Sequence, residues 1–158
     1  MASREMLAPV TLRAVTPDDV SAIAAIEQRA FSDPWPASAF LDLLPMSHAR
    51  LTAAFDADGA LCGYCVLLHV VDEGEIANIA VAPERRRRGI AARLLDDALQ
   101  TAHATGLTAL FLEVRMSNEA ARNLYASRGF EPVGRRRAYY RAPLEDALVL
   151  RWERPSAP

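Results

Sequence analysis

The stretch from residue 75 to residue 114 constrains the fold most, because it changes from a strand pattern to a helix pattern and back. Residues 75–81 are rich in β-formers and are typical of a strand. Apolar side chains then recur at every fourth position through residues 88–105, which predicts an amphipathic helix that ends at Gly106. Residues 107–114 form an apolar run typical of a buried central strand. This order predicts a parallel crossover with its helix packed on one face of a sheet.

Strand and helix signals on both sides of this unit predict a larger mixed sheet. Further strands are expected at residues 10–15, 50–55, 60–71, 130–133, 138–140 and 147–152, and further helices at residues 17–31, 36–44 and 118–128. Antiparallel strands come first and crossovers follow. We therefore expect an α/β (α+β) fold, a mixed sheet of six to seven strands flanked by about four helices, as a single domain over residues 1–158.

The composition excludes several classes of function. The chain has 158 residues, of which 51% are hydrophobic and 24% charged, as in ordinary globular proteins. Its net charge of −2 argues against a general nucleic-acid binder. All 18 basic residues are arginine, which excludes a P-loop lysine and a Schiff base. The longest apolar stretch, residues 60–71, is too short for a membrane span, and the N-terminus lacks an apolar signal region, so we expect a cytoplasmic protein without a membrane partner.

The two cysteines form a C-G-Y-C pair, which invites a redox interpretation. A redox pair of this spacing stands at the start of a helix, where the thiol pKa is lowered. Cys62 and Cys65 instead lie within a strand-like run, which predicts buried core cysteines that point to opposite faces of the sheet. No second pair is present to complete a zinc site, and no metal is expected.

The junction before the long helix has the features of a phosphate site. The strand ends before Pro83, four arginines follow at residues 85–88, and Gly89 and Ala91 open the helix. A helix N-terminus offers unpaired N–H groups and a positive dipole end, and arginines add charged hydrogen bonds. The expected ligand is a pyrophosphate, and the alternative is a solvated basic turn. Neither the Rossmann nor the P-loop glycine pattern is present.

Several motifs, in a fixed order, carry a resemblance that covers nearly the whole chain. They are F-S-x-P-W from Phe31, N-I-A-V at residues 78–81, Arg86-x-x-Gly89-x-Ala91, L-E-V-R-x-S-N at residues 112–118, A-x-x-L-Y-x-x-x-G-F from Ala121, R-x-Y-Y from Arg137 and E-D-A from Glu145. In these motifs the chain resembles the Gcn5-related N-acetyltransferase (GNAT) superfamily, and within it the RimI-type ribosomal-protein alanine N-acetyltransferases.

The resemblance implies a GNAT fold in which two central strands splay apart, and acetyl-CoA as the co-substrate. The pantetheine arm would lie in the gap between residues 75–81 and residues 107–114, hydrogen-bonded like an added strand. The implied cofactor-binding residues are Ile79, Ala80 and Val81 beside the acyl group, Arg86, Arg87, Arg88, Gly89, Ile90, Ala91 and Ala92 around the pyrophosphate, and Asn118 at the pantetheine.

The resemblance also implies two catalytic residues. Glu113 stands where the family's proton acceptor falls, and Glu75 and Glu73 are rival bases on the earlier strand. An α-amino group has a pKa of about 7.7–8.0, against about 10.4 for lysine, so a carboxylate acting through water suffices as its base. Tyr125 is assigned as the acid that protonates the leaving thiolate. The alternatives are an ion pair with a nearby arginine for Glu113 and core packing for Tyr125.

The expected reaction is direct transfer of an acetyl group to the N-terminal alanine of a protein, most simply a small-subunit ribosomal protein. Other protein termini, lysine or a small amine are alternative acceptors, and a non-catalytic acetyl-CoA-binding module is the alternative of another class. Trp35, Tyr139 and Tyr140 either line the peptide groove or pack in the core. Arginines 135–137 either contact ribosomal RNA or form a solvated turn, and no direct nucleic-acid function is expected.

Overall fold

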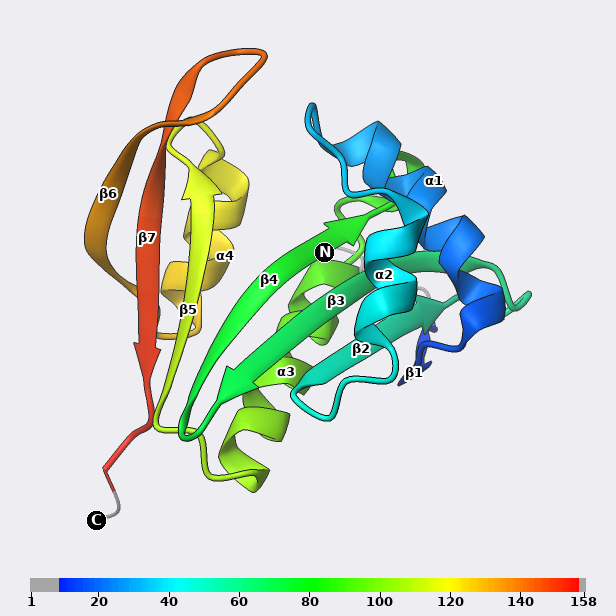
Figure 1. The fold of residues 1–158 in the computed structure, drawn as a ribbon, viewed down its shortest axis with the longest axis horizontal. Coiled ribbons are helices and arrows are strands. Elements are labelled where there is room, and N and C mark those ends of the chain that lie inside the picture. The colour runs from blue at the N-terminus through cyan, green and yellow to red at the C-terminus, as the bar shows by residue number, and fades with distance from the viewer. Residues whose placement is uncertain (1–8, 157–158) are drawn as a thin grey trace, which may run out of the picture.

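The computed structural model describes residues 9–156, and its elements follow the predicted order (Figure 1). The strands are β1 (Thr11–Ala14), β2 (Ala49–Phe55), β3 (Leu61–Val70), β4 (Glu73–Val81), β5 (Ala109–Arg115), β6 (Glu131–Tyr140) and β7 (Glu145–Glu153). The α-helices are α1 (Val20–Ala30), α2 (Ala37–Leu43), α3 (Ile90–Ala104) and α4 (Glu119–Ser127), and short 3-10 turns at Pro17–Asp19 and Pro83–Arg85 precede α1 and α3.

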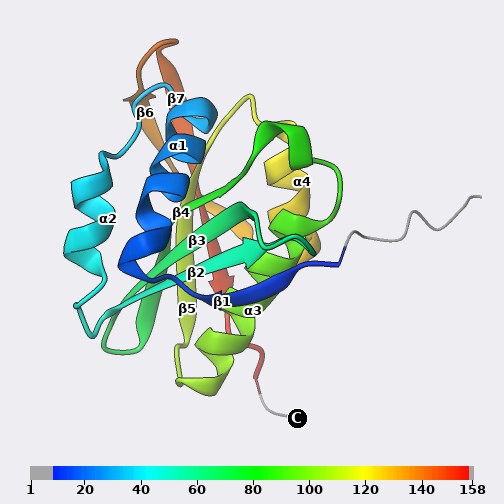
Figure 2. The same cartoon turned by 90° about the vertical axis from the view of Figure 1, so that its right-hand side faces the viewer.

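The strands form one seven-stranded sheet in the order β1-β2-β3-β4-β5-β7-β6. The pair β4 and β5 is parallel, and the other neighbours are antiparallel. Helices α1 and α2 cover one face and α3 and α4 the other (Figure 2), each over its own apolar cluster. The expected mixed sheet with four helices is confirmed. No helix within residues 9–156 has both the length and the apolar character that a membrane crossing requires.

The central strands β4 and β5 pair over only a short length. Residues 73–75 of β4 are in register with residues 109–111 of β5, and beyond them the two strands diverge (Figure 1). Gly74 allows the close approach, since a Cβ there would lie 2.6 Å from Leu110 Cδ2. Residues 76–81 and 112–115 keep only their outer neighbours, β3 and β7. The splay implied by the resemblance is therefore present.

One long strand, β6, replaces the two short ones predicted at residues 130–133 and 138–140. Gly134, Arg135 and Arg136 stay paired with β7 through an irregular register. The prediction was wrong because a glycine followed by three charged residues is typical of a turn, yet an edge strand also carries exposed arginines. Residues 135–137 are exposed but lie within this strand, so the predicted turn is wrong, and Arg135 and Arg136 are each in an ion pair.

Both cysteines are buried, but the prediction that they point to opposite faces is wrong. Cys62 and Cys65 pack into the same apolar cluster as α3. The register between β2 and β3 shifts between Ala54 and Phe55, which leaves Cys62 as an extra residue in a bulge and turns its side chain to the face of Cys65. Both thiols are free, and burial raises the pKa of Cys65 to about 12. This environment is that of inert core cysteines.

Candidate active site

The start of α3 presents charge and unpaired backbone groups together. Gly89 caps the helix with φ of +76°, a left-handed conformation that favours glycine. The first helical bond runs from the Arg93 N–H to the Gly89 carbonyl, so the N–H groups before it lack an intrahelical partner. Arg86, Arg87 and Arg88 are exposed, and none of them forms an ion pair with a carboxylate of residues 9–156. Such a junction suits a pyrophosphate.

The first arginine of the run has a different role. Nη2 of Arg85 lies 2.5 Å from Oδ2 of Asp56, in the turn between β2 and β3. Asp56 also accepts the N–H groups of Asp58 and Ala60, and these bonds, first that of Ala60 and then that of Arg85, lower the pKa of its carboxyl. Arg85 therefore anchors the loop and leaves the three arginines after it free to contact a ligand.

The diverging part of β4 exposes backbone groups toward the gap. The Ala82 N–H donates to Cys62 of β3, so by strand alternation the backbone groups of Ile79 and Val81 face β5. The register shift between β3 and β4 leaves Ala77 as an extra residue in a bulge beside the point where the strands part. The edge of β4 is thus free to pair with an extended ligand, as the resemblance implies.

Glu113 lies on the diverging part of β5 and forms an ion pair with an arginine of β6. Nε of Arg136, on β6, is 2.7 Å from Oε1 of Glu113, so the ion pair that the sequence left open is present. The Glu113 side chain is 17% exposed. Across the gap, Glu75 of β4 has a raised pKa, first because of partial burial and then because of the negative charge of Glu113. Arg136 pairs with Glu113, and its positive charge also acts on Glu75.

Tyr125 lies on α4, in the apolar cluster of the opposite face. Its ring packs edge-on to Phe130 with centroids 5.7 Å apart, and burial raises the pKa of the phenol. The same cluster contains Leu112 and Val114, which flank Glu113 on β5 and point the other way. The two catalytic side chains of the prediction are therefore not side by side. They approach the diverging strands from opposite faces of the sheet.

The Tyr125 hydroxyl is the unusual part of this side chain. The residue is only 6% exposed, yet its hydroxyl forms no hydrogen bond with residues 9–156. No polar side-chain atom in that part of the chain is both sealed from solvent and without a partner. The hydroxyl is therefore accessible and unengaged, as a proton donor to a ligand would be.

Asn118 has a structural task in this fold. Its Oδ1 accepts the Ala121 N–H at 3.2 Å and caps α4, as its sequence position predicts. A cap of this kind fixes the side-chain oxygen, which leaves the amide nitrogen as the group for a pantetheine contact.

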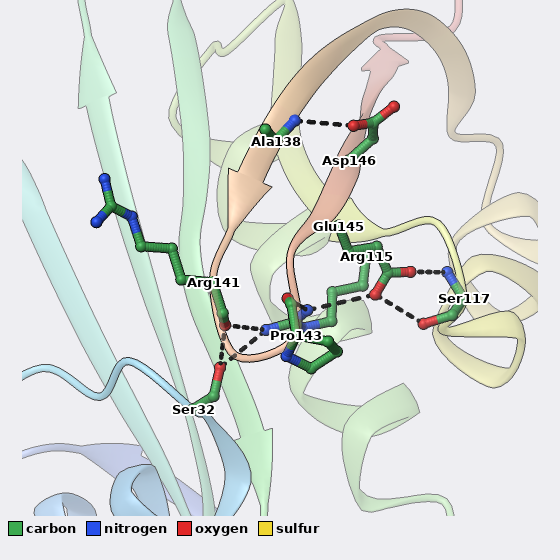
Figure 3. A network of polar contacts seen from close by, with 8 residues as sticks. All are labelled: Ser32, Arg115, Ser117, Ala138, Arg141, Pro143, Glu145 and Asp146. Atoms are coloured by element: carbon green, nitrogen blue, oxygen red, sulfur yellow. Dashed lines mark hydrogen bonds and ion pairs between the residues drawn. The ribbon is translucent and has the colours of Figure 1, made fainter.

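A polar network centred on Arg115 ties the β6–β7 turn to the site (Figure 3). Nη2 of Arg115 donates to Ser32 Oγ at 2.8 Å and to the Arg141 carbonyl at 3.1 Å, and Nη1 lies 3.3 Å from Oε1 of Glu145. Glu145 also accepts from Ser117, through N–H and hydroxyl, and these contacts lower the pKa of its carboxyl. The L-E-V-R-x-S-N and E-D-A motifs are thus partners that hold this turn against the segment after α1.

The aromatic residues predicted either to line the peptide groove or to pack in the core have different environments. Trp35 is half-buried and packs against Phe40, with centroids 5.5 Å apart. Tyr140 lies under Arg115, whose guanidinium carbon is 4.4 Å from the ring centre. Tyr139 is 48% exposed and is free to contact an acceptor.

The sequence analysis missed a buried carboxylate on α1. Glu27 is 1% exposed and accepts hydrogen bonds from the Tyr64 hydroxyl, from Asn78 Nδ2 at 2.8 and 2.7 Å, and from the Trp35 N–H at 3.1 Å. It joins α1 to β3, to β4 beside its bulge, and to the segment before α2. Its sequence signal is an acid on the apolar face of a helix, four residues after Ile23.

Replacing Glu27 by alanine is expected to reduce the free energy of unfolding by about 3 kcal/mol, because each buried donor left without an acceptor costs about 1–3 kcal/mol. Urea denaturation measures the change. Asp42→Ala, an exposed acid on α2, is the matched control and should change stability by less than about 0.5 kcal/mol. Equal stabilities of the two variants would contradict a structural role for this network.

Comparisons with known proteins agree with this geometry. Residues 20–130 match the family model described as "Acetyltransferase (GNAT) family". The chain is 38% identical over 149 residues to the N-alpha-acetyltransferase RimI of Mycobacterium tuberculosis, covering 90% of this chain and 92% of that one. It is 34% identical over 142 residues to the [ribosomal protein bS18]-alanine N-acetyltransferase of Salmonella typhimurium, covering 89% of this chain and 95% of that one.

A solved structure gives the same result. The crystal structure of the ribosomal-protein-S18-alanine N-acetyltransferase from Escherichia coli superposes with a TM-score of 0.87 at 31% identity, covering 95% of this chain and 97% of that one. A family match over most of the chain, relatives above 30% identity and the splayed sheet lead to one conclusion. The chain belongs to the GNAT acetyltransferase family and is an N-acetyltransferase of the RimI type.

Proposed function

We propose that this enzyme transfers the acetyl group of acetyl-CoA to the N-terminal alanine of a small-subunit ribosomal protein of the bS18 kind. Relatives in Salmonella typhimurium and Escherichia coli carry that activity in their names. The observation that carries the proposal is the gap between β4 and β5, with Glu113 on one face and the unengaged hydroxyl of Tyr125 on the other.

The donor would bind from the side of α3 and α4. Arg86, Arg87 and Arg88, with the N–H groups of residues 87–92, hold the pyrophosphate, and the free edge of β4 pairs with the pantetheine arm. Acetyl-CoA supplies an activated thioester. The N–H groups of Ile79 and Val81 face the gap, where they are placed to donate to the acyl carbonyl.

The acceptor would enter from the other face, past the exposed ring of Tyr139 and toward Glu113. Glu113 takes a proton from the α-ammonium group, directly or through water, which leaves a neutral amine to attack the thioester. Tyr125 gives a proton to the leaving thiolate, whose conjugate thiol has an ordinary pKa of about 8.5 against about 10 for a phenol. The second proton, which the amine nitrogen loses as the amide forms, returns to the phenolate through solvent. Transfer is direct, because both cysteines are buried in the apolar cluster away from exposed positions.

The test is acetylation of synthetic peptides by the purified protein. We expect thiol release from acetyl-CoA, and a mass increase of one acetyl group, with a peptide that begins with alanine and follows the bS18 N-terminus. The same peptide with a blocked N-terminus, but with an internal lysine, should not react. Reaction with the blocked peptide or with a polyamine alone would assign another acceptor. Binding of acetyl-CoA without turnover on any amine would show a non-catalytic module.

The arginine loop gives a second prediction. The double variant Arg86→Ala, Arg88→Ala is expected to weaken acetyl-CoA binding at least about tenfold, since each charge-assisted hydrogen bond contributes about 1.5–3 kcal/mol before solvent exposure reduces it. Titration calorimetry at two salt concentrations measures the loss. Arg50→Ala, which removes an exposed arginine paired with Asp97 on another part of the surface, is the control. Equal affinities of both variants and the wild type would place the pyrophosphate elsewhere.

A further inference from the structure

Strand β6 leaves its regular pairing with β7 close to Glu113. Arg136 is in register with Ala147 and Tyr140 with Glu145, so β6 has more residues than β7 between these two pairs. Within this bulge Ala138 has φ of +51°, a conformation that residues other than glycine rarely adopt. A bulge changes the direction of the side chains around it. This irregular pairing therefore needs a nearby contact that stabilises it.

That contact comes from Asp146 on β7. Its Oδ1 accepts the Ala138 N–H at 2.8 Å, as Figure 3 shows, and its Oδ2 accepts from Arg135 Nε at 2.6 Å. The bond from Ala138, followed by that from Arg135, lowers the pKa of the Asp146 carboxyl, which keeps it ionised at neutral pH. This carboxylate satisfies the backbone N–H that the bulge removes from the strand ladder.

Beside this bulge, Arg136 is still in register with Ala147 of β7, and its side chain reaches across β7 to Glu113 on β5. Nε of Arg136 lies 2.7 Å from Oε1 of Glu113. The nearby carboxylate of Glu113, together with burial, raises the pKa of Tyr139 to about 12. The guanidinium carbon of Arg136 is 5.6 Å from the centre of the Tyr139 ring. A cation next to the bulge therefore lies against the residue assigned as the base.

The acceptor's amine has to reach the same carboxylate. An α-amino group has a pKa of about 7.7–8.0 and arrives largely as a cation at neutral pH. The guanidinium of Arg136 is also a cation, but it does not lose its proton, so it does not become a nucleophile that takes the acetyl group. Glu75, at the last paired position of β4, feels the charge of Glu113, and exchanging one cation for the other leaves the net charge around these two carboxyl groups unchanged.

We propose that Arg136 occupies the place of the acceptor's α-ammonium group at Glu113 and yields it to the substrate, so that it sets the affinity for acceptors. The inference rests on the proposed function. The Arg136 side chain is 60% exposed. An exposed ion pair contributes about 0.2–1 kcal/mol, which a substrate that also binds along the groove can overcome.

The experiment compares peptide kinetics of Arg136→Gln and wild type at saturating acetyl-CoA. The peptide KM is expected to fall about threefold to fivefold, which corresponds to the upper half of the range for an exposed pair. The kcat and the KM for acetyl-CoA should stay within about twofold. Arg136→Lys keeps a cation and should return the peptide KM toward the wild-type value. Arg137→Gln, an exposed neighbour, is the matched control.

Three results would overturn the inference. A higher peptide KM would mean that Arg136 helps to bind the acceptor. A kcat reduced tenfold at constant KM would mean that it orients Glu113, and an unchanged KM would mean that no exchange takes place. Titration of the peptide into each enzyme without acetyl-CoA compares the peptide affinities directly, in the absence of turnover. If the wild type acetylates a different amine, the proposed acceptor fails, while the KM ratio with that amine still decides the role of Arg136.

Discussion

Replacing Glu113 by glutamine is expected to lower kcat/KM for an alanine-led peptide by about 10²–10⁴-fold, the usual contribution of a general base. Glutamine keeps the shape of the side chain but does not accept a proton at neutral pH. Most of the loss should be in kcat, and acetyl-CoA affinity should stay within about twofold, because Glu113 lies on the face of the sheet opposite α3 and α4. Steady-state kinetics and calorimetry separate the two effects.

The rival bases supply the controls for this prediction. Glu75→Gln is expected to lower kcat/KM less than tenfold, since this residue acts on Glu113 through its charge across the gap. Glu73→Gln, at the exposed start of β4, should have little effect. A loss with Glu75→Gln as large as that with Glu113→Gln would move the base to β4. Wild-type turnover in Glu113→Gln would remove Glu113 from the mechanism.

Local signals in the sequence predicted most of the fold and the position of the loop at residues 85–89. The four-residue apolar period of α3, its end at Gly106 and the apolar run of β5 depend on neighbours in the sequence, and the structure contains each of them. Gly89 was identified as a small residue that opens the helix, and in the structure it has a left-handed conformation, which favours glycine. Such features are determined within a few residues and do not depend on the remainder of the chain.

What the sequence did not predict depends on partners far away in the chain. The strand seemed to end before Gly134, but residues 134–136 pair with β7, and beyond them Asp146 stabilises the bulge at Ala138 through a side-chain contact. The Cys62 bulge depends on register against β2. Glu27 finds its donors on β3 and β4. Neither hydrophobic period nor turn chemistry reports a register or a tertiary hydrogen bond, and these decide which side chains meet at Glu113.

Replacing Tyr125 by phenylalanine is expected to lower kcat by about 10²–10⁴-fold, as for loss of a general acid, with little change in acetyl-CoA affinity. The substitution removes one oxygen and keeps the ring that packs against Phe130. The hydroxyl has no hydrogen-bond partner within residues 9–156, so its removal leaves no donor or acceptor of that region unsatisfied. The free energy of unfolding should therefore change by less than about 0.5 kcal/mol.

Tyr64→Phe is the matched control, because its hydroxyl is engaged. That hydroxyl donates to the buried carboxylate of Glu27. Burial, followed by this hydrogen bond and the negative charge of Glu27, raises the pKa of the Tyr64 phenol. Its loss should reduce the free energy of unfolding by about 1–2 kcal/mol. The turnover of each folded molecule should stay near wild type.

The two tyrosine variants thus separate packing from chemistry. Both keep an aromatic ring in a buried cluster and lose one oxygen. If the Tyr125 hydroxyl protonates the leaving sulfur, Tyr125→Phe is a stable enzyme with low kcat and Tyr64→Phe is a less stable enzyme with normal kcat. A Tyr125→Phe enzyme with wild-type kcat would show that its phenol only packs, and would leave solvent as the proton source. Urea denaturation and single-turnover acetylation, measured on the same preparations, decide between these results.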